Sequence, residues 1–315
     1  MTRRTAIFDL GGVVLSWDPV RAFSAEVDTA EARRLMSDVD FTTWNRRNDA
    51  GRRFADGEAE VADTWPEYAD AITAYRRHFD RTLTGTVPGT SAIVAELARA
   101  GVRLFGLTNW SDETFPVAQR RFGILRRFEA IVVSGQEKIA KPDPRLYRLL
   151  LDRYHVDAGS AVFVDDSQAN CAAAADLGVR AIRFSDADSL RERLVRAGFL
   201  GAHRPVSQSL FHVTERAVWQ AARAAGCYPW SSHGSSYEAE GFVHLAFREQ
   251  VAAVIERYFG RFEPEELVAL ELDPALARPV VEEGTTESFP HLFTPLTEQM
   301  VVREIDVHEQ FTGSA

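Results

Sequence analysis

Residues 4–14 read RTAIFDLGGVV, and this stretch decides the fold of the first part of the chain. A short apolar run around Ile7 is interrupted by Asp9 and followed at once by Gly11 and Gly12. A run of this length that ends in paired glycines is typical of a buried strand entering a tight turn. We therefore expect a strand over residues 4–10, with Asp9 at its carboxyl end.

Further strands and helices alternate after this stretch. Strands are predicted over residues 102–109, 128–134, 160–166 and 179–184, and helices over residues 92–100, 113–122, 144–154, 169–177 and 189–197. This alternation implies parallel crossover units and an open α/β sheet. Ligands of such sheets bind at the carboxyl ends of the strands. Polar side chains are expected at that edge: Asp9, Thr108, Asn109, Asp165 and Asp166.

The chain has two further regions of different character. Residues 18–82 are polar and helical throughout, which predicts an all-helical insertion after the first strand. Residues 201–209, GAHRPVSQS, lack an apolar period and read as a linker. New strands (210–213, 241–246, 267–272, 279–283, 300–305) and helices (214–226, 248–259) follow. We expect one domain over residues 1–200, with a helical cap at about 18–82, and a small α+β domain over residues 209–306.

The composition narrows the class of protein. With 315 residues, 45% of them hydrophobic, the chain can bury a sizeable core, and its formal net charge is −10. An acidic balance argues against a nucleic-acid partner. No stretch approaches the roughly 20 apolar residues of a membrane span. The two cysteines, Cys171 and Cys227, have no metal-ligand spacing and fit a reducing compartment. We expect a cytoplasmic protein that binds neither nucleic acid nor membranes.

Four short strings carry the chemistry of the first domain: FDLGG with Asp9, LTN with Thr108, AKPDPRLY with Lys141, and VFVDDSQAN with Asp165 and Asp166. Each is common alone, since an aspartate often caps a helix and a KPDP string often leads into one. In this order, each beside a predicted strand end, they resemble the signature motifs of the haloacid dehalogenase-like hydrolase superfamily. The resemblance covers residues 4–197 and is to the branch of small phosphatases with a helical cap.

The resemblance implies a Rossmann-like parallel sheet and a Mg²⁺-dependent phosphohydrolase acting on a small phosphorylated metabolite. Asp9 would be the nucleophile, because a carboxylate can form an aspartyl-phosphate and split a difficult step in two. Magnesium would lower the repulsion between the carboxylate and phosphate. Its ligands would be Asp9, the Gly11 carbonyl, Asp165 and Asp166. The implied phosphoryl-binding residues are Gly11, Gly12, Thr108, Asn109 and Lys141, with Asn170 holding the last motif in place.

One position departs from the family pattern. Most phosphatases of the superfamily carry a second aspartate two residues after the nucleophile as a general acid and base, and here that residue is Gly11. The enzyme then either prefers substrates with good leaving groups or obtains a proton donor from water or from the cap, where Arg47, Asp49 and Glu58 are candidates. The alternative function is a non-catalytic phosphate- or nucleotide-binding regulatory protein. True dehalogenation is disfavoured, because the Asp165–Asp166 pair resembles a metal site.

Strings in residues 209–306, among them LFHVTERAVWQAARAAG and EGFVHLAFREQ, resemble the uncharacterised domain family 952. That family is similar in fold to ADP-ribosyltransferases, which implies a nucleotide or ADP-ribose-like ligand. His212, His244 and His291 lie in or beside apolar strands, where histidines are commonly core residues. They could instead line a cleft with Ser232, Glu282 and Tyr228, or form a three-histidine zinc site.

Overall fold

The computed structural model describes residues 3–201, 206–284 and 286–311. It divides into two compact units, one made of Met1–Thr90, Ala100–Arg121 and Leu125–Leu200, the other of Ser91–Arg99, Phe122–Ile124 and Gly201–Ala315. Residues 202–205 of the predicted linker lie outside the described residues. Within the described residues, no helix combines the length and apolar character needed to cross a membrane.

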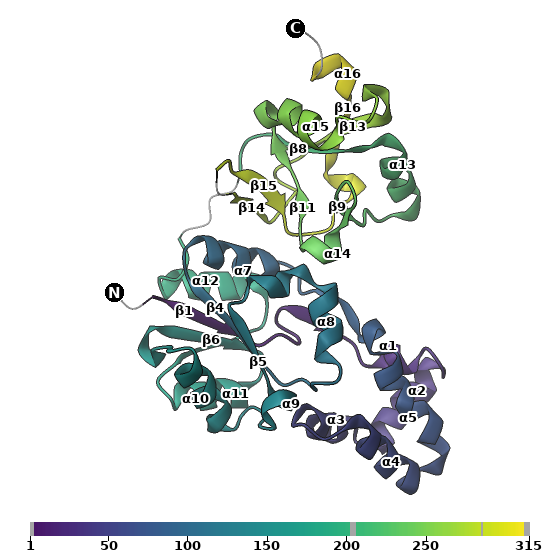
Figure 1. Cartoon of the computed structure of the whole chain (residues 1–315), viewed down its shortest axis with the longest axis vertical. Coiled ribbons are helices and arrows are strands. Elements are labelled where there is room, and N and C mark those ends of the chain that lie inside the picture. The colour runs from purple at the N-terminus through teal and green to yellow at the C-terminus, as the bar shows by residue number, and fades with distance from the viewer. Residues whose placement is uncertain (1–2, 202–205, 285, 312–315) are drawn as a thin grey trace. The chain divides into compact units, whose positions relative to one another are not determined.

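A five-stranded parallel sheet forms the centre of the first unit (Figure 1). Its order is β5 (Ala130–Val133), β4 (Arg103–Thr108), β1 (Thr5–Phe8), β6 (Ala161–Asp165) and β7 (Arg180–Arg183). All four residues of β1 and all five of β6 are buried, as expected of parallel strands covered on both faces. The predicted fold class, a Rossmann-like sheet with an inserted helical cap and a small α+β domain, is confirmed.

Helices connect successive strands of this sheet, as the alternating pattern predicts. They are α8 (Phe115–Arg121), α9 (Ser134–Glu137), α10 (Pro144–Arg153) and α11 (Gln168–Ala175). Helix α12 (Ala187–Arg196) follows β7, and α7 (Thr90–Arg99), which precedes β4 in the chain, falls almost entirely in the other unit. Helix α10 begins where Asp143 accepts a hydrogen bond from the Arg145 N–H and Pro144 takes the first helical position. Its buried side chains pack in one cluster with sheet residues such as Phe105 and Phe163. These side chains are Leu146, Tyr147 and Leu150.

The cap consists of helices α1 (Val20–Phe23), α2 (Thr29–Asp38), α3 (Phe41–Asp49), α4 (Phe54–Thr64), α5 (Ala69–Arg77) and α6 (Phe79–Thr82). Its aromatic residues form one cluster in which Tyr75 contacts Phe23, Phe41, Trp44 and Phe54, with ring centroids 5.0 to 6.0 Å apart. These five aromatic residues therefore form the core of the cap.

Two short strands, β2 (Leu15–Trp17) and β3 (Leu83–Thr86), join the cap to the rest of the unit. They pair in an antiparallel ribbon, with Leu15 opposite Thr86. Neither strand is expected from the sequence, because three or four residues are too few to show an alternating pattern. The chain thus enters and leaves the cap through one paired ribbon.

The second unit contains a four-stranded sheet, in the order β12 (Ala246–Phe247), β8 (Leu210–Glu215), β13 (Leu267–Leu272) and β16 (Val301–Asp306). A three-stranded sheet has the order β11 (Val243–His244), β15 (Phe289–Leu292) and β14 (Val280–Glu283), and β9 (Trp230–Ser232) pairs with β10 (Ser235–Ser236). The helices are α13 (Arg216–Ala225), α14 (Tyr237–Glu240), α15 (Val251–Phe259) and α16 (Val307–Gln310). The single strand predicted over residues 241–246 is wrong in detail, because β11 and β12 belong to different sheets.

Candidate active site

Asp9 follows the last residue of β1 directly, at the centre of the parallel sheet. Its main-chain N–H donates to the Val164 carbonyl at 2.8 Å, so the strand pairing continues one residue past Phe8 and holds Asp9 beside the end of β6. Its Oδ1 accepts a hydrogen bond from the Leu10 N–H at 2.7 Å. The side chain of Asp9 is therefore fixed at the sheet edge where ligands of parallel α/β folds bind.

Lys141 and Asp165 meet Asp9 in a buried cluster. The Lys141 ammonium lies 3.0 Å from Asp9 Oδ1 and 2.7 Å from Asp165 Oδ2, and the exposed fractions of Lys141 and Asp165 are 5% and 0%. The Asn170 amide donates to both oxygens of Asp165, at 3.0 and 3.1 Å, and the Ser167 N–H donates to Oδ1 at 2.8 Å. Lys141 is thus held between two carboxylates that come from neighbouring strands.

The side chain of Asn109 positions Lys141. Its amide nitrogen donates to the Lys141 carbonyl at 3.0 Å, and its oxygen accepts from the Lys141 N–H at 2.8 Å. Both polar ends of Asn109 are therefore engaged with the main chain of one residue, in a loop where the peptide bond from Lys141 to Pro142 is cis. Asn109 also lines the cavity in front of Asp9, where the sequence analysis placed it as a substrate-binding residue.

The turn after Asp9 and the end of β4 leave polar groups available to a ligand. Thr108 is buried, and its hydroxyl has no hydrogen-bond partner in the described chain. Gly12 has φ +76°, and a Cβ there would lie 3.0 Å from an Asp166 carboxylate oxygen, so this turn requires glycine. Gly11 has open space where a Cβ would project.

The cluster contains more carboxylates than cationic groups, and the pKa values of its members reflect this excess. Burial raises the pKa of Asp9 to about 7; Lys141 opposes the rise, and Asp165 adds to it. Burial alone would lower the pKa of Lys141, but Asp9 and Asp165 reverse this and raise it. Burial and the neighbouring Asp165 also raise the pKa of Asp166. Three carboxylates therefore share one ammonium group, an arrangement that a bound cation would stabilise.

The donor set fits a hard divalent cation. Asp9, Asp165 and Asp166 each offer an oxygen, and these oxygens lie within 4.8 Å of one another. Carboxylate oxygens together with water are the ligands that Mg²⁺ prefers. Within the described ranges this is the one such group of three acidic, histidine or cysteine residues, and it does not include the three histidines of the second unit.

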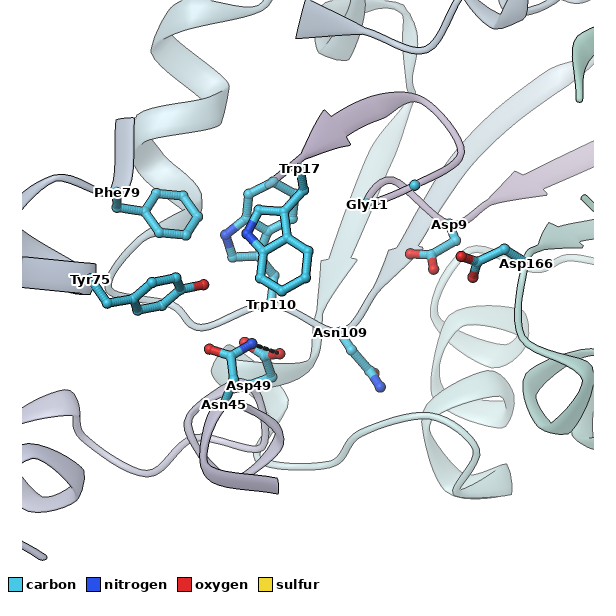
Figure 2. Close-up of a pocket in the computed structure, with 11 residues that line it drawn as sticks. Asp9, Gly11, Trp17, Asn45, Asp49, Tyr75, Phe79, Asn109, Trp110 and Asp166 are labelled. Atoms are coloured by element: carbon cyan, nitrogen blue, oxygen red, sulfur yellow. Dashed lines mark hydrogen bonds between the residues drawn. The ribbon is translucent and has the colours of Figure 1, made fainter. Parts of the chain in front are cut away.

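A cavity of about 380 Å³ opens between the cap and Asp9 (Figure 2). Figure 2 shows Asp9 and Asp166 on one side of it and the cap residues Asn45 and Asp49 on another. The other lining side chains are mostly aromatic: Trp17, Tyr75, Phe79 and Trp110, together with Asn109, Gly11 and Gly12. None of the described lining residues is a lysine or an arginine. The wall in front of Asp9 is therefore largely aromatic, with Asn45 and Asp49 as its polar cap residues, and its described lining residues carry no positive charge.

Of the three cap residues considered as proton donors, Asp49 lines this cavity. Arg47 is instead paired with Glu60 on the exposed surface, at 2.8 Å. Glu58 is held by two hydrogen bonds from Arg76, at 2.9 and 3.0 Å. Sequence spacing could not choose among the three, because their side chains leave the cap in different directions.

Comparison with known proteins identifies the first unit. The family model described as haloacid dehalogenase-like hydrolase matches residues 3–178, and that described as protein of unknown function DUF952 matches residues 213–304. The chain belongs to the haloacid dehalogenase-like hydrolase family. Both resemblances seen in the sequence are thereby confirmed. As a member of this hydrolase family, the chain is an enzyme.

Relatives of this hydrolase family include named phosphatases. The chain is 26% identical to a sesquiterpene phosphatase of Aspergillus oryzae, over 59% of this chain and 91% of that one. It is 32% identical to a phosphoserine phosphatase of Thermus thermophilus, over 37% of this chain and 45% of that one. A solved HAD family enzyme of Bacteroides thetaiotaomicron is 19% identical and has a TM-score of 0.47, over 58% of this chain and 95% of that one. The chain thus spans most of one curated relative and under half of another.

The second unit contains a smaller cavity, of about 240 Å³, that His212, His244 and His291 line together with Ser232 and Glu283. His212 is buried. Its Nδ1 lies 2.8 Å from the His244 carbonyl oxygen and its Nε2 2.7 Å from the Tyr228 hydroxyl, while burial lowers its pKa to about 4. These are the properties of a neutral structural histidine.

His291 is the histidine paired with an acid. Its Nδ1 lies 3.1 Å from a carboxylate oxygen of Glu283, and the acid that lines the cavity is Glu283, not the neighbouring Glu282 named from the sequence. His244 packs edge-on against the His291 ring, with centroids 4.8 Å apart. No lysine or arginine is among the described residues that line this cavity.

Proposed function

We propose that the first domain is a magnesium-dependent phosphatase in which Asp9 is the nucleophile. The observation that carries this proposal is the buried cluster in which one ammonium lies 3.0 Å from Asp9 and 2.7 Å from Asp165. A buried ammonium group beside a carboxylate nucleophile can stabilise the negative charge of a phosphoryl group as it arrives. The test is Mg²⁺-dependent phosphate release by the wild type compared with Asp9→Asn.

Each residue of the cluster has a role in this proposal. Asp9 attacks phosphorus and becomes an aspartyl-phosphate, which water then hydrolyses. Lys141 orients Asp9 and neutralises phosphoryl charge, and the unpartnered Thr108 hydroxyl donates to a phosphoryl oxygen. Asp9, Asp165, Asp166 and the Gly11 carbonyl would hold Mg²⁺. When bound, the ion would supply charge that reduces repulsion between the carboxylates and the phosphate.

The alternative, a phosphate-binding regulatory protein, would need the phosphoryl site without turnover. Such a protein has no need of a carboxylate that is both buried and hydrogen-bonded to a lysine at the phosphoryl position. Burial of charge is costly unless a function or a partner compensates for it. The retention of this cluster therefore favours catalysis over binding.

The cavity also indicates a class of substrate. An aromatic wall stabilises an apolar organic group, whereas a substrate carboxylate would meet Asp49 and no cationic side chain among the lining residues. We propose that the preferred substrates are phosphate monoesters of apolar alcohols. The name of the Aspergillus relative, a sesquiterpene phosphatase, agrees with this class.

A pair of alkyl phosphates tests this preference. We expect kcat/KM for 2-phenylethyl phosphate to exceed that for phosphoglycolate by about 10-fold or more, because burial of an aromatic group contributes roughly 1.5–3 kcal/mol. Trp17→Ala should reduce the preference, while Trp230→Ala, which removes a similarly exposed tryptophan from the other unit, should leave it unchanged. Equal kcat/KM values for the two substrates would contradict the proposed class.

For the second domain, we propose that the cavity lined by His244 and His291 binds an uncharged heterocycle, such as the base of a nucleotide or ADP-ribose-like ligand. Its apolar walls and neutral His212 support a flat, uncharged ring. The absence of lysine and arginine among its described lining residues would leave phosphates outside the cavity.

Ligand-dependent stability tests this second proposal. In the full chain carrying Asp9→Asn, we expect adenosine, ADP-ribose or NAD to raise the unfolding temperature of the second domain. A saturating ligand at 100 times its Kd stabilises by about 2.7 kcal/mol. Val254→Phe, which fills the cavity from helix α15, should abolish the shift. A flat response to all three compounds would contradict binding at this site.

A further inference from the structure

Asp9 and Lys141 account for the attack on phosphorus, but neither explains how the leaving oxygen is protonated. An alkoxide is a poor leaving group, and a proton delivered to its oxygen accelerates the step by about 10²–10⁴-fold. Gly11 has no side chain to deliver that proton. The following inference rests on the proposed phosphatase function and concerns the source of the proton.

Asp49 lies in the cavity in front of the nucleophile. It is the last residue of helix α3, and it lines the same cavity as Asp9 (Figure 2). In an in-line displacement, the leaving oxygen lies on the side of phosphorus away from the attacking carboxylate. A phosphoryl group bound at Asp9 would therefore direct its leaving oxygen away from the sheet edge, into the cavity that Asp49 lines.

The main chain and side chain of Asp49 are both fixed. The hydroxyl of Ser134, the first residue of α9, donates a hydrogen bond to the Asp49 carbonyl oxygen, and it accepts one from the Trp110 N–H at 2.9 Å. The Asn45 amide donates to Asp49 Oδ2 at 2.9 Å. Asp49 is thus a cap residue whose position is set by the loops of the catalytic sheet.

The surroundings of Asp49 favour a carboxyl that can both give and accept a proton near neutral pH. Burial raises its pKa to about 7; the Ser111 N–H opposes the rise, and Asp9 adds to it. The other ionisable side chains on the cavity wall are Tyr75, from helix α5, and Asp166, after β6. An acid–base catalyst is most effective when its pKa is close to the working pH.

We propose that Asp49 is the general acid and base of this phosphatase, in place of the carboxylate that position 11 lacks. As Asp9 attacks and the bond from phosphorus to the ester oxygen breaks, the Asp49 carboxyl gives its proton to that oxygen, and the alcohol leaves. The Asp49 carboxylate then takes a proton from the water whose oxygen attacks the aspartyl-phosphate. Phosphate leaves, and Asp9 and the protonated Asp49 are regenerated.

The open space at Gly11 provides a direct test, because a side chain there meets no atom within 4 Å of its Cβ. We expect Asp49→Asn to lower kcat/KM for 2-phenylethyl phosphate by roughly 10²–10⁴-fold. Its effect on 2,4-dinitrophenyl phosphate, whose leaving group needs no proton, should be less than about 10-fold. The double variant Gly11→Asp with Asp49→Asn should recover much of the loss on the alkyl ester.

The pH profile separates proton transfer from positioning. The wild-type kcat/KM for the alkyl ester should fall as the pH rises past about 7, because the carboxyl loses the proton it must donate. This descending limb should be absent in Asp49→Asn. Asp63→Asn, which changes an exposed carboxylate of the cap, should retain both the limb and the rate.

Two results would overturn the role of Asp49. One is an equal loss on the alkyl and dinitrophenyl esters in a variant that unfolds at the wild-type temperature. The other is persistence of the descending limb in Asp49→Asn. Failure of the proposed function has a different signature, namely wild-type protein that releases no phosphate from either ester with Mg²⁺. Turnover of the dinitrophenyl ester by Asp49→Asn would itself show that the variant folds.

Discussion

Asp9→Asn should reduce Mg²⁺-dependent phosphate release by roughly 10⁴-fold or more, as expected when a covalent nucleophile is removed. An asparagine side chain has nearly the same shape and can still accept a hydrogen bond from Lys141, but it cannot form the aspartyl-phosphate. The substitution also removes one negative charge from a buried cluster, so we expect the unfolding temperature to stay level or rise. Steady-state phosphate release and thermal unfolding measure the two effects.

The matched control for this variant is Asp186→Asn. Asp186 caps helix α12 by accepting a hydrogen bond from the Ser189 N–H, a role that asparagine can also perform. We expect its rate to remain within about twofold of the wild-type rate. If Asp9→Asn released phosphate as fast as this control, Asp9 would not be the nucleophile, and the regulatory alternative would gain support if neither wild type nor variant turned over.

Lys141→Met should impair both activity and folding. It removes the one ammonium group between Asp9 and Asp165, and a buried ion pair that loses one partner costs about 3–5 kcal/mol of unfolding free energy. The rate of phosphate release should fall by roughly 10²–10³-fold, the usual effect of removing one group that stabilises developing charge. Chemical denaturation and steady-state kinetics measure these two quantities.

Lys138→Met is the control, because Lys138 is an exposed lysine in the same loop. We expect it to change the unfolding free energy by less than about 0.5 kcal/mol, as is usual for surface positions. Added Mg²⁺ should recover part of the stability lost by Lys141→Met, since a cation among the three carboxylates replaces missing positive charge. Equal stability of Lys141→Met and Lys138→Met would contradict the inferred charge balance.

The sequence predicts the parallel sheet well, because the burial of its strands produces continuous apolar runs such as AVFV in β6. The same property places Asp9, Thr108 and Asp165 correctly at the carboxyl ends of strands. The ribbon of β2 and β3 is missed, because its pairing depends on two segments separated by the whole cap. Local periodicity carries no information about such a partner.

The sequence predicts where the site lies better than it predicts which residues form it. The sequence names Lys141, but the amide of Asn109 that holds its main chain is a contact between residues 32 positions apart. The sequence likewise offers Arg47, Asp49 and Glu58 as equals. Only the folded cap shows that Arg47 and Glu58 have ion-pair partners elsewhere, whereas Asp49 lines the cavity in front of Asp9.

The hydrogen bond from Ser134 to the Asp49 carbonyl bears on which phosphate esters the enzyme hydrolyses quickly. The group that would protonate the product alcohol belongs to the cap, and this hydrogen bond ties its main chain to a residue that follows β5. A phosphate ester whose alcohol breaks this hydrogen bond would therefore meet Asp9 without its acid in place, and it would turn over slowly even if it bound tightly. Selection among alcohols would then operate on the rate of bond breaking as well as on affinity.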